Sequence, residues 1–106
     1  MQRITEQLIE EIKDRIVRAV QPENIIVFGS YAYGTPSKES DLDLLVIMPS
    51  DEPMHSRVTK IRKLVRDIHI PKDIIVYTPQ EVEKWKDASA AFITTIIRKG
   101  KVIYGQ

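Results

Sequence analysis

The sequence predicts a single α/β domain spanning residues 1–106, in which helices flank a mixed β-sheet of three to four strands. Helical and strand-like blocks alternate along the whole chain without a repeat or a linker, a pattern typical of α/β domains. Acidic residues open two of the strands and a glycine closes a third. These residues can meet only if the sheet has both parallel and antiparallel neighbours. A chain of 106 residues can bury a core without disulfides.

The first half of the chain contains two helices and two strands. Isoleucine or leucine recurs every fourth residue from position 4 to position 16 and predicts an amphipathic helix that ends before Pro22. The segment NIIVF, residues 24–28, is a short β-rich run that stops at Gly29. A brief helix is expected from Ser30 to about Gly34. The segment DLDLLVIM, residues 41–48, is the second strand.

The second half continues the alternation. Apolar residues at helical spacing between positions 55 and 69 predict another helix, and DIIVYT, residues 73–78, is the third strand. Thr78-Pro79-Gln80-Glu81 has the pattern of a capping box with proline at the first helical position. The helix that begins there runs to Gly100, either unbroken or as two helices separated near Ser89. The segment KVIYG, residues 101–105, is a candidate edge strand.

Composition narrows the function classes. Sixteen basic and fifteen acidic residues give a formal charge of +1, so the chain as a whole does not attract nucleic acid or a membrane surface. The amino terminus is charged throughout, unlike a signal peptide, and no apolar run is long enough to span a bilayer. The absence of cysteine suits a reducing compartment. The sequence therefore predicts a cytoplasmic protein with no membrane partner.

The stretch FGSYAYGTPSKESDLDLLV, residues 28–46, contains the candidate site. On a strand, residues two apart point to the same face about 6.6 Å from each other, so Asp41 and Asp43 project together while Leu42 and Leu44 face the other side. Two converging carboxylates at the edge of a core repel each other and need a cation. Magnesium fits best, because it binds one or two carboxylates together with waters and substrate phosphates.

The Gly-Ser pair that precedes these carboxylates suggests the other half of such a site. Gly29 permits the backbone to approach a phosphate closely, and Ser30 supplies a hydroxyl and the free amides of a helix start. The sequence therefore predicts that Gly29 and Ser30 bind phosphates and that Asp41 and Asp43 hold the metal.

A third carboxylate supports this site and dictates the sheet. Asp73 opens its own apolar strand as Asp41 opens the preceding one. For Gly29, at the end of the first strand, to meet Asp41, the first two strands must run antiparallel. For Asp73 to join them, the second and third strands must run parallel, with a right-handed crossover helix between them.

These residues resemble the minimal nucleotidyltransferases of the DNA polymerase beta superfamily. The resemblance rests on GSYAYG, on the ten residues between Gly-Ser and Asp-Leu-Asp, and on the further strand-opening aspartate. It implies a nucleotidyltransferase fold, in which Asp41 and Asp43 bind two magnesium ions. It also implies that Asp73 completes the metal site and helps to deprotonate an acceptor hydroxyl, while Gly29 and Ser30 contact the triphosphate of a nucleoside triphosphate, here expected to be ATP.

The resemblance also implies a partner. Members of this minimal kind are often encoded beside a helical HEPN-type toxin, which they silence as antitoxins, in some cases by adding AMP to a tyrosine. One difference from relatives is that the turn after Gly-Ser often carries arginine, whereas Tyr31 and Tyr33 occupy it here. These tyrosines fit either packing of the short helix or stacking on a base. Homo-oligomer formation remains open.

Other functions compete with the enzymatic one. A non-catalytic antitoxin would mask its partner and keep the aspartates for nucleotide binding. A nucleic-acid adaptor would use the basic helix, but its basic residues are expected on a solvated face: Arg57, Lys60, Arg62, Lys63 and Arg66. Trp85 and Phe92 are expected in the core or in an interface. The preferred prediction is a magnesium-dependent transferase that moves AMP from ATP to a hydroxyl.

Overall fold

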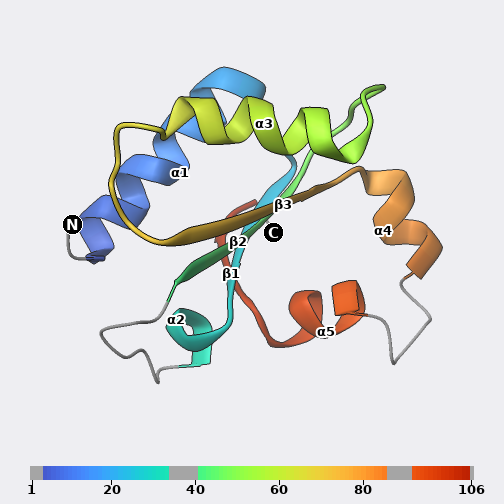
Figure 1. Ribbon diagram of the computed structural model, residues 1–106. Coiled ribbons are helices and arrows are strands. Elements are labelled where there is room, and N and C mark those ends of the chain that lie inside the picture. The colour runs from blue at the N-terminus through green and yellow to red at the C-terminus, as the bar shows by residue number, and fades with distance from the viewer. Residues whose placement is uncertain (1–3, 34–40, 86–91, 106) are drawn as a thin grey trace.

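The computed structural model describes residues 4–33, 41–85 and 92–105. It confirms the predicted alternation of helices and strands (Figure 1). In chain order the elements are α1 (Glu6–Val20), β1 (Asn24–Phe28), α2 (Ser30–Tyr33), β2 (Leu42–Ile47), α3 (Met54–Leu64), β3 (Lys72–Tyr77), α4 (Pro79–Trp85), α5 (Phe92–Lys99) and β4 (Lys101–Tyr104). The expected helix break near Ser89 lies outside the described residues. None of the described helices is long and apolar enough to cross a membrane.

The sheet has the mixed topology that the acidic residues require. The strand order is β3-β2-β1-β4, with β1 antiparallel to both β2 and β4 and with β2 parallel to β3. The last segment of the chain therefore does form an edge strand. The prediction of three to four strands is confirmed with four, and α3 makes the crossover between the two parallel strands.

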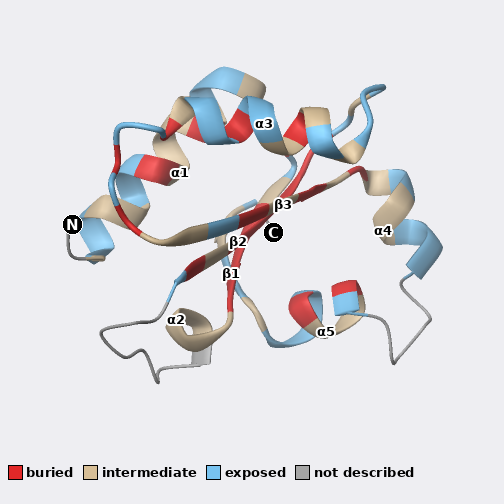
Figure 2. Ribbon diagram, in the orientation of Figure 1, coloured by how far each residue is buried: buried red, intermediate tan, exposed pale blue. Residues whose placement is uncertain are grey.

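Helices cover both faces of this sheet (Figure 1). One face packs against α1 and α3 around Ile16, Leu44 and Ile61, and the other packs against α5 around Leu45 and Ile96. Buried residues concentrate on the central strands and on the inner sides of these helices (Figure 2). Because both faces are covered, β2 reads as a nearly continuous apolar run after Asp43. The side-chain alternation along β2 decides which residues share the face of the candidate site.

The helix α3 is shorter than its apolar pattern predicts. It ends at Leu64, although Val65 and Ile68 beyond it are also buried in the core. At this end, Arg15 of α1 donates a hydrogen bond from Nη1 to the Leu64 carbonyl at 3.1 Å and also pairs with Asp67. The carbonyl at the helix end is therefore satisfied by a tertiary contact. No glycine or proline marks this end in the sequence, so the boundary could not be predicted locally.

Arg57 contradicts the prediction of a solvated basic face. Its side chain is buried, and it forms a bidentate pair with Glu81, with Nη1–Oε1 and Nη2–Oε2 distances of 2.7 and 3.1 Å. It also donates to the carbonyls of Glu52 and Val76 at 2.9 and 2.8 Å. Glu81 in turn closes the predicted capping box, because its carboxylate accepts from the Thr78 amide at 2.8 Å. Arg57 thus ties α3, β3 and α4 together.

We expect Arg57→Met to destabilise the fold by about 2 to 4 kcal/mol, because the Glu81 carboxylate and two backbone carbonyls lose the guanidinium that donates hydrogen bonds to them. Arg57 lowers the pKa of Glu81, so this stabilisation is present above the usual glutamate pKa and is lost as the pH falls through the lowered value. Urea unfolding at several pH values measures both effects.

The matched control is Lys60→Met, which removes an exposed pair with Glu52 from the same helix. It should cost less than about 1 kcal/mol at every pH. Equal losses for the two variants would show that the buried network of Arg57 does not stabilise the fold specifically.

Candidate active site

Strand pairing brings the predicted site residues to one end of the sheet. In the β1–β2 pair Asp43 lies opposite Phe28, and in the parallel β2–β3 pair it lies opposite Asp73. Asp41 immediately precedes β2, and Gly29 immediately follows β1. The two strand relations inferred from the sequence are both confirmed, and they place Gly29, Asp41, Asp43 and Asp73 close together.

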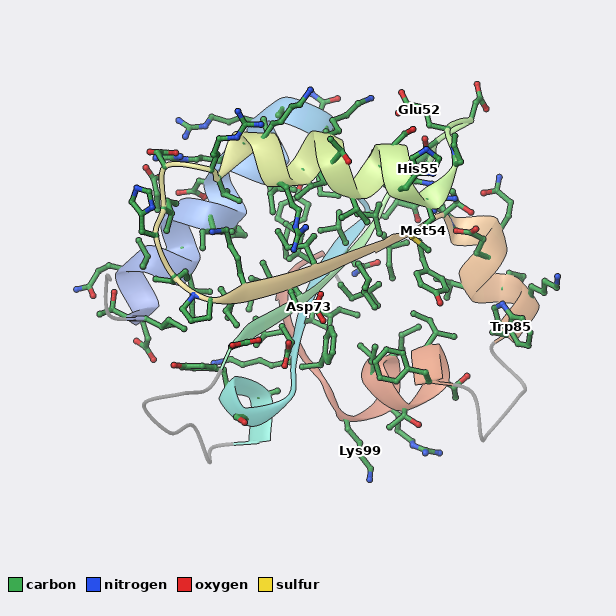
Figure 3. All side chains as sticks on the ribbon, viewed as in Figure 1. Glu52, Met54, His55, Asp73, Trp85 and Lys99 are labelled. Atoms are coloured by element: carbon green, nitrogen blue, oxygen red, sulfur yellow. The ribbon has the colours of Figure 1, made fainter. Side chains whose placement is uncertain are left out.

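The carboxylates point to the face covered by α5. Alternation along β2 sends Leu42 and Leu44 into the core beneath α1 and α3, and it sends Leu45 into the core against α5. Asp43 shares the direction of Leu45. The side chain of Asp73 lies on the same side of β3, toward α2 and α5 (Figure 3). The predicted separation of Asp43 from Leu42 and Leu44 onto opposite faces is therefore observed.

The electrostatics of this cluster centre on Asp43. Burial raises the pKa of its carboxyl above the usual value, and the nearby charges of Asp73 and then Asp41 raise it further. Asp43 is half-buried, whereas Asp41 and Asp73 are exposed. The innermost carboxylate is thus the one most disfavoured as an anion.

Gly29 is required by this carboxylate. Its φ of +75° lies in the left-handed region, which side chains disfavour. A Cβ at this position would overlap the Oδ2 atom of Asp43 and come within 3.3 Å of its Cγ. The glycine therefore serves both the turn and the close approach of backbone to carboxylate. Its own carbonyl accepts a hydrogen bond from the Ala32 amide at 3.0 Å, which starts the short helix.

The residues after Gly29 form the other wall of the site. Ser30 is the first residue of α2 and is half-buried. Tyr31 is also half-buried and packs against the core beneath α1, which favours packing over base stacking. The side chain of Tyr33 lies outside the described part of the structure, as do Gly34 and the loop that follows it.

A divalent cation fits this group of residues on two observations: three carboxylates gather at one end of the sheet, and burial together with the charges of Asp73 and Asp41 raises the pKa of Asp43. Among the described residues, no three acidic or histidine side chains are arranged as a complete metal-binding cluster. Magnesium does not need one, because it binds to one or two carboxylates and takes its other ligands from water and substrate phosphates. The arrangement suits a metal shared with a bound nucleotide.

The fold and the acidic edge together define a nucleotidyltransferase, and comparison of the sequence with protein families agrees. The model of the nucleotidyltransferase domain matches residues 7–98. The chain belongs to this family, and the match confirms that the resemblance to nucleotidyltransferases is correct. Domains of the family generally use a nucleoside triphosphate and a divalent metal ion. Among curated proteins, none matched the chain.

Solved structures show the same fold. A candidate nucleotidyltransferase from Sulfolobus solfataricus is 25% identical, with a TM-score of 0.60 over 76% of this chain and 73% of that one. Two mutants of the toxin–antitoxin pair MntA-HpeT are also similar. The one with two aspartate-to-glutamate substitutions is 21% identical, with a TM-score of 0.59 over 97% of this chain and 75% of that one. The tyrosine-to-alanine mutant is 20% identical, with a TM-score of 0.58 over 98% and 75%.

The structure excludes one of the two environments predicted for Trp85 and Phe92. They are 43% and 62% exposed, so they are not core residues and the interface alternative stays a prediction; Phe92 contacts Phe28 edge-on at 5.9 Å between ring centroids. Lys72, the neighbour of Asp73, carries no motif in the sequence that marks it as a candidate. The burial of Arg57 could have been suspected, because it precedes the buried Ile61 by one helical turn and so continues the apolar stripe.

The raised pKa of Asp43 predicts that Asp43→Asn does not destabilise the metal-free protein at neutral pH. A folded-state pKa above the unfolded value means that the free energy of unfolding falls as the pH rises from the usual aspartate pKa through the raised value. The neutral amide removes this fall. Urea unfolding between about pH 3 and pH 8 should show the variant gaining on the parent as the pH rises.

The control is Asp51→Asn, which alters an exposed aspartate in the turn after β2. Its stability relative to the parent should not follow the same course with pH. A clear loss of stability in Asp43→Asn at neutral pH would contradict the repulsion inferred at this edge.

Proposed function

We propose that this protein is a magnesium-dependent nucleotidyltransferase that moves AMP from ATP to a tyrosine hydroxyl of a HEPN-type toxin and so acts as an antitoxin. The observation that carries the proposal is the convergence of Asp41 and Asp73 on Asp43, directly beside the left-handed Gly29. The membership in the nucleotidyltransferase family supports the transfer reaction, and the likeness to the MntA-HpeT toxin–antitoxin pair supports the kind of partner.

Each residue of the site has a separate task in this proposal. Asp41 and Asp43 hold magnesium, and Asp73 joins them from the neighbouring strand. Gly29 and Ser30 bind the phosphates through backbone amides and the serine hydroxyl. The bound metal supplies positive charge to the phosphates and to the leaving group. The negative charge of the three carboxylates is then neutralised only when magnesium binds together with the nucleotide.

The transfer itself needs mainly positioning and charge neutralisation. The oxygen of the acceptor hydroxyl attacks the α-phosphorus of ATP, and the bond from that phosphorus to the bridging oxygen of the β-phosphate breaks. The products are an AMP ester of the acceptor and pyrophosphate. Asp73 accepts the proton of the hydroxyl, because it is exposed at the edge strand, where an incoming acceptor can reach it.

A protein acceptor suits the small size of the domain. The carboxylates lie at an exposed end of the sheet, between α2 and the region of α5 (Figure 3). The described part of the chain offers few elements to enclose a second small molecule, so an acceptor has to bring its own surface. Exposed apolar side chains on α4, α5 and β4, namely Trp85, Phe92, Ile97 and Val102, are available to anchor such a partner.

The first test is transfer to the partner. The purified protein is incubated with magnesium, ATP and the protein encoded by the neighbouring gene, which we expect to be of HEPN type, and the intact partner is weighed by mass spectrometry. We expect a gain of one or more AMP units with the parent and with Asp51→Asn, and none with Asp43→Asn, because that variant loses the central metal ligand. A tight complex without a mass gain would instead identify a masking antitoxin that does not catalyse transfer.

The second test separates the role of Asp73 from that of the metal ligands. If Asp73 accepts the proton, Asp73→Asn should lower the rate of transfer about a hundredfold or more while changing the affinity for magnesium-ATP much less. Calorimetry gives the affinity, and the appearance of modified partner gives the rate. Asp43→Asn, in contrast, should lose metal-supported binding as well. Normal turnover in Asp73→Asn would show that this aspartate only begins a strand.

A further inference from the structure

A basic hollow of about 480 Å³ lies between the last turns of α3 and the first residue of the edge strand β3. It is lined by Thr59, Arg62, Lys63, Arg66, Ile70 and Lys72. Four of these six residues are cations and none is acidic. The formal net charge of the chain is only +1, so this concentration of positive charge is not a property of the whole chain. It needs an explanation from the residues and contacts around the hollow.

Helix-end stabilisation accounts for only part of this charge. Arg62 and Lys63 lie in the last turn of α3, where cations interact favourably with the helix dipole. Arg66 and Lys72 lie beyond the helix. Lys72 is half-buried, and its ammonium donates to the carbonyls of Ile68 and Ile70 at 2.6 and 3.4 Å, so it is held in place at the hollow.

The four cations share one hollow, and none of the described residues that line it is a carboxylate that would pair with them. The positive charge of the hollow therefore favours binding of an anion, just as the negative charge of the three aspartates favours binding of a cation.

The position of the hollow connects it to the candidate active site. Lys72 and Asp73 are consecutive residues of β3, and their side chains point to opposite faces of the sheet. Lys72, which lines the hollow, and Asp73, which belongs to the carboxylate cluster, thus lie at the same end of one edge strand and on its two faces. A chain that crosses the outer edge of β3 at this point reaches both.

The outer edge of β3 is open at this end. In the parallel pair the carbonyls of Pro71 and Tyr77 bond to β2, so the alternating groups of Lys72, Ile74 and Val76 point outward. The Val76 carbonyl is taken by Arg57, which closes the far end of the edge. No described strand pairs with the outer side of β3, so an extended segment could add to it beside Lys72.

We propose that this hollow docks an acidic segment of the protein that accepts the nucleotide, with glutamate or aspartate side chains held by Arg62, Lys63, Arg66 and Lys72 and with the acceptor hydroxyl directed across β3 to Asp73. The proposal rests on the proposed function for its acceptor. Cations at this place also offset the repulsion that an acidic segment meets at three carboxylates.

An acidic peptide fits the hollow better than a nucleic acid does. None of its six lining residues is aromatic, so it has no platform on which an unpaired base could stack. Its positive charge is confined to four side chains and is not extended along a stripe that could follow a phosphate backbone. Specificity would come from charge and from strand addition along β3, which are features of peptide recognition.

The test measures binding without nucleotide or metal. Fluorescence anisotropy compares a short labelled peptide with one tyrosine among glutamates, the same peptide with glutamine in place of glutamate, and a labelled single-stranded RNA. We expect the glutamate peptide to bind and the glutamine peptide not to bind. Arg62→Gln/Arg66→Gln should weaken the binding about tenfold, and added salt should weaken it in the parent.

The matched control is Lys84→Gln/Arg98→Gln, which removes the same charge from exposed positions on α4 and α5 and should leave the affinity unchanged. Equal weakening by both double variants would overturn the docking site in favour of general charge attraction. Tighter binding of the RNA than of the glutamate peptide, lost in Arg62→Gln/Arg66→Gln, would overturn it in favour of nucleic acid. Neither result affects nucleotidyl transfer, which the partner assay decides separately.

Discussion

The repulsion among Asp41, Asp43 and Asp73 is the constraint on which the rest of the structure depends. Burial and the like charges of Asp73 and Asp41 disfavour the anion of the half-buried Asp43, and this opposes folding at the end of the sheet. The apolar packing on both faces of the sheet has to offset it. The strands that carry the aspartates accordingly continue into fully buried residues, and the site forms where that core ends. The three aspartates thus lower the stability of the metal-free fold at the position where a cation would bind.

Register ties the core and the site to each other. The side chains of a strand alternate between two faces, so a slip of β2 by one residue would turn Asp43 into the core and Leu44 toward the site. Helices bury both faces of this sheet, and such a slip would also break the contacts with α1 and α5. Gly29 adds a local restriction, because only a residue without a Cβ leaves space for the Asp43 carboxylate. The catalytic geometry is therefore specified by packing.

The sequence predicted the sheet and the acidic edge because both depend on short-range patterns. Strand alternation decides the direction of Asp43, and the need to join Gly29 with Asp73 decides which strands are parallel. What it could not predict depends on contacts between distant residues. The spacing of Arg57 to Ile61 indicates a buried position, but the partners that make its burial possible do not follow from that spacing. They are the Glu81 carboxylate and the Val76 carbonyl, which lie on other elements. The end of α3 depends in the same way on a side chain of α1.

The near-neutral net charge of the chain conceals a separation of charge by the edge strand. Asp73 faces the acidic side of the sheet and Lys72 the basic hollow, one residue apart on β3. At physiological salt, charges interact over about 8 Å. The aspartates and the basic hollow therefore both act on a molecule that binds at this end of β3, but they have little effect on molecules farther away. A metal nucleotide suits one side and an acidic segment suits the other. If both bind at once, each neutralises charge that would otherwise repel the other, and occupation of the nucleotide site then favours docking of the acceptor beside it.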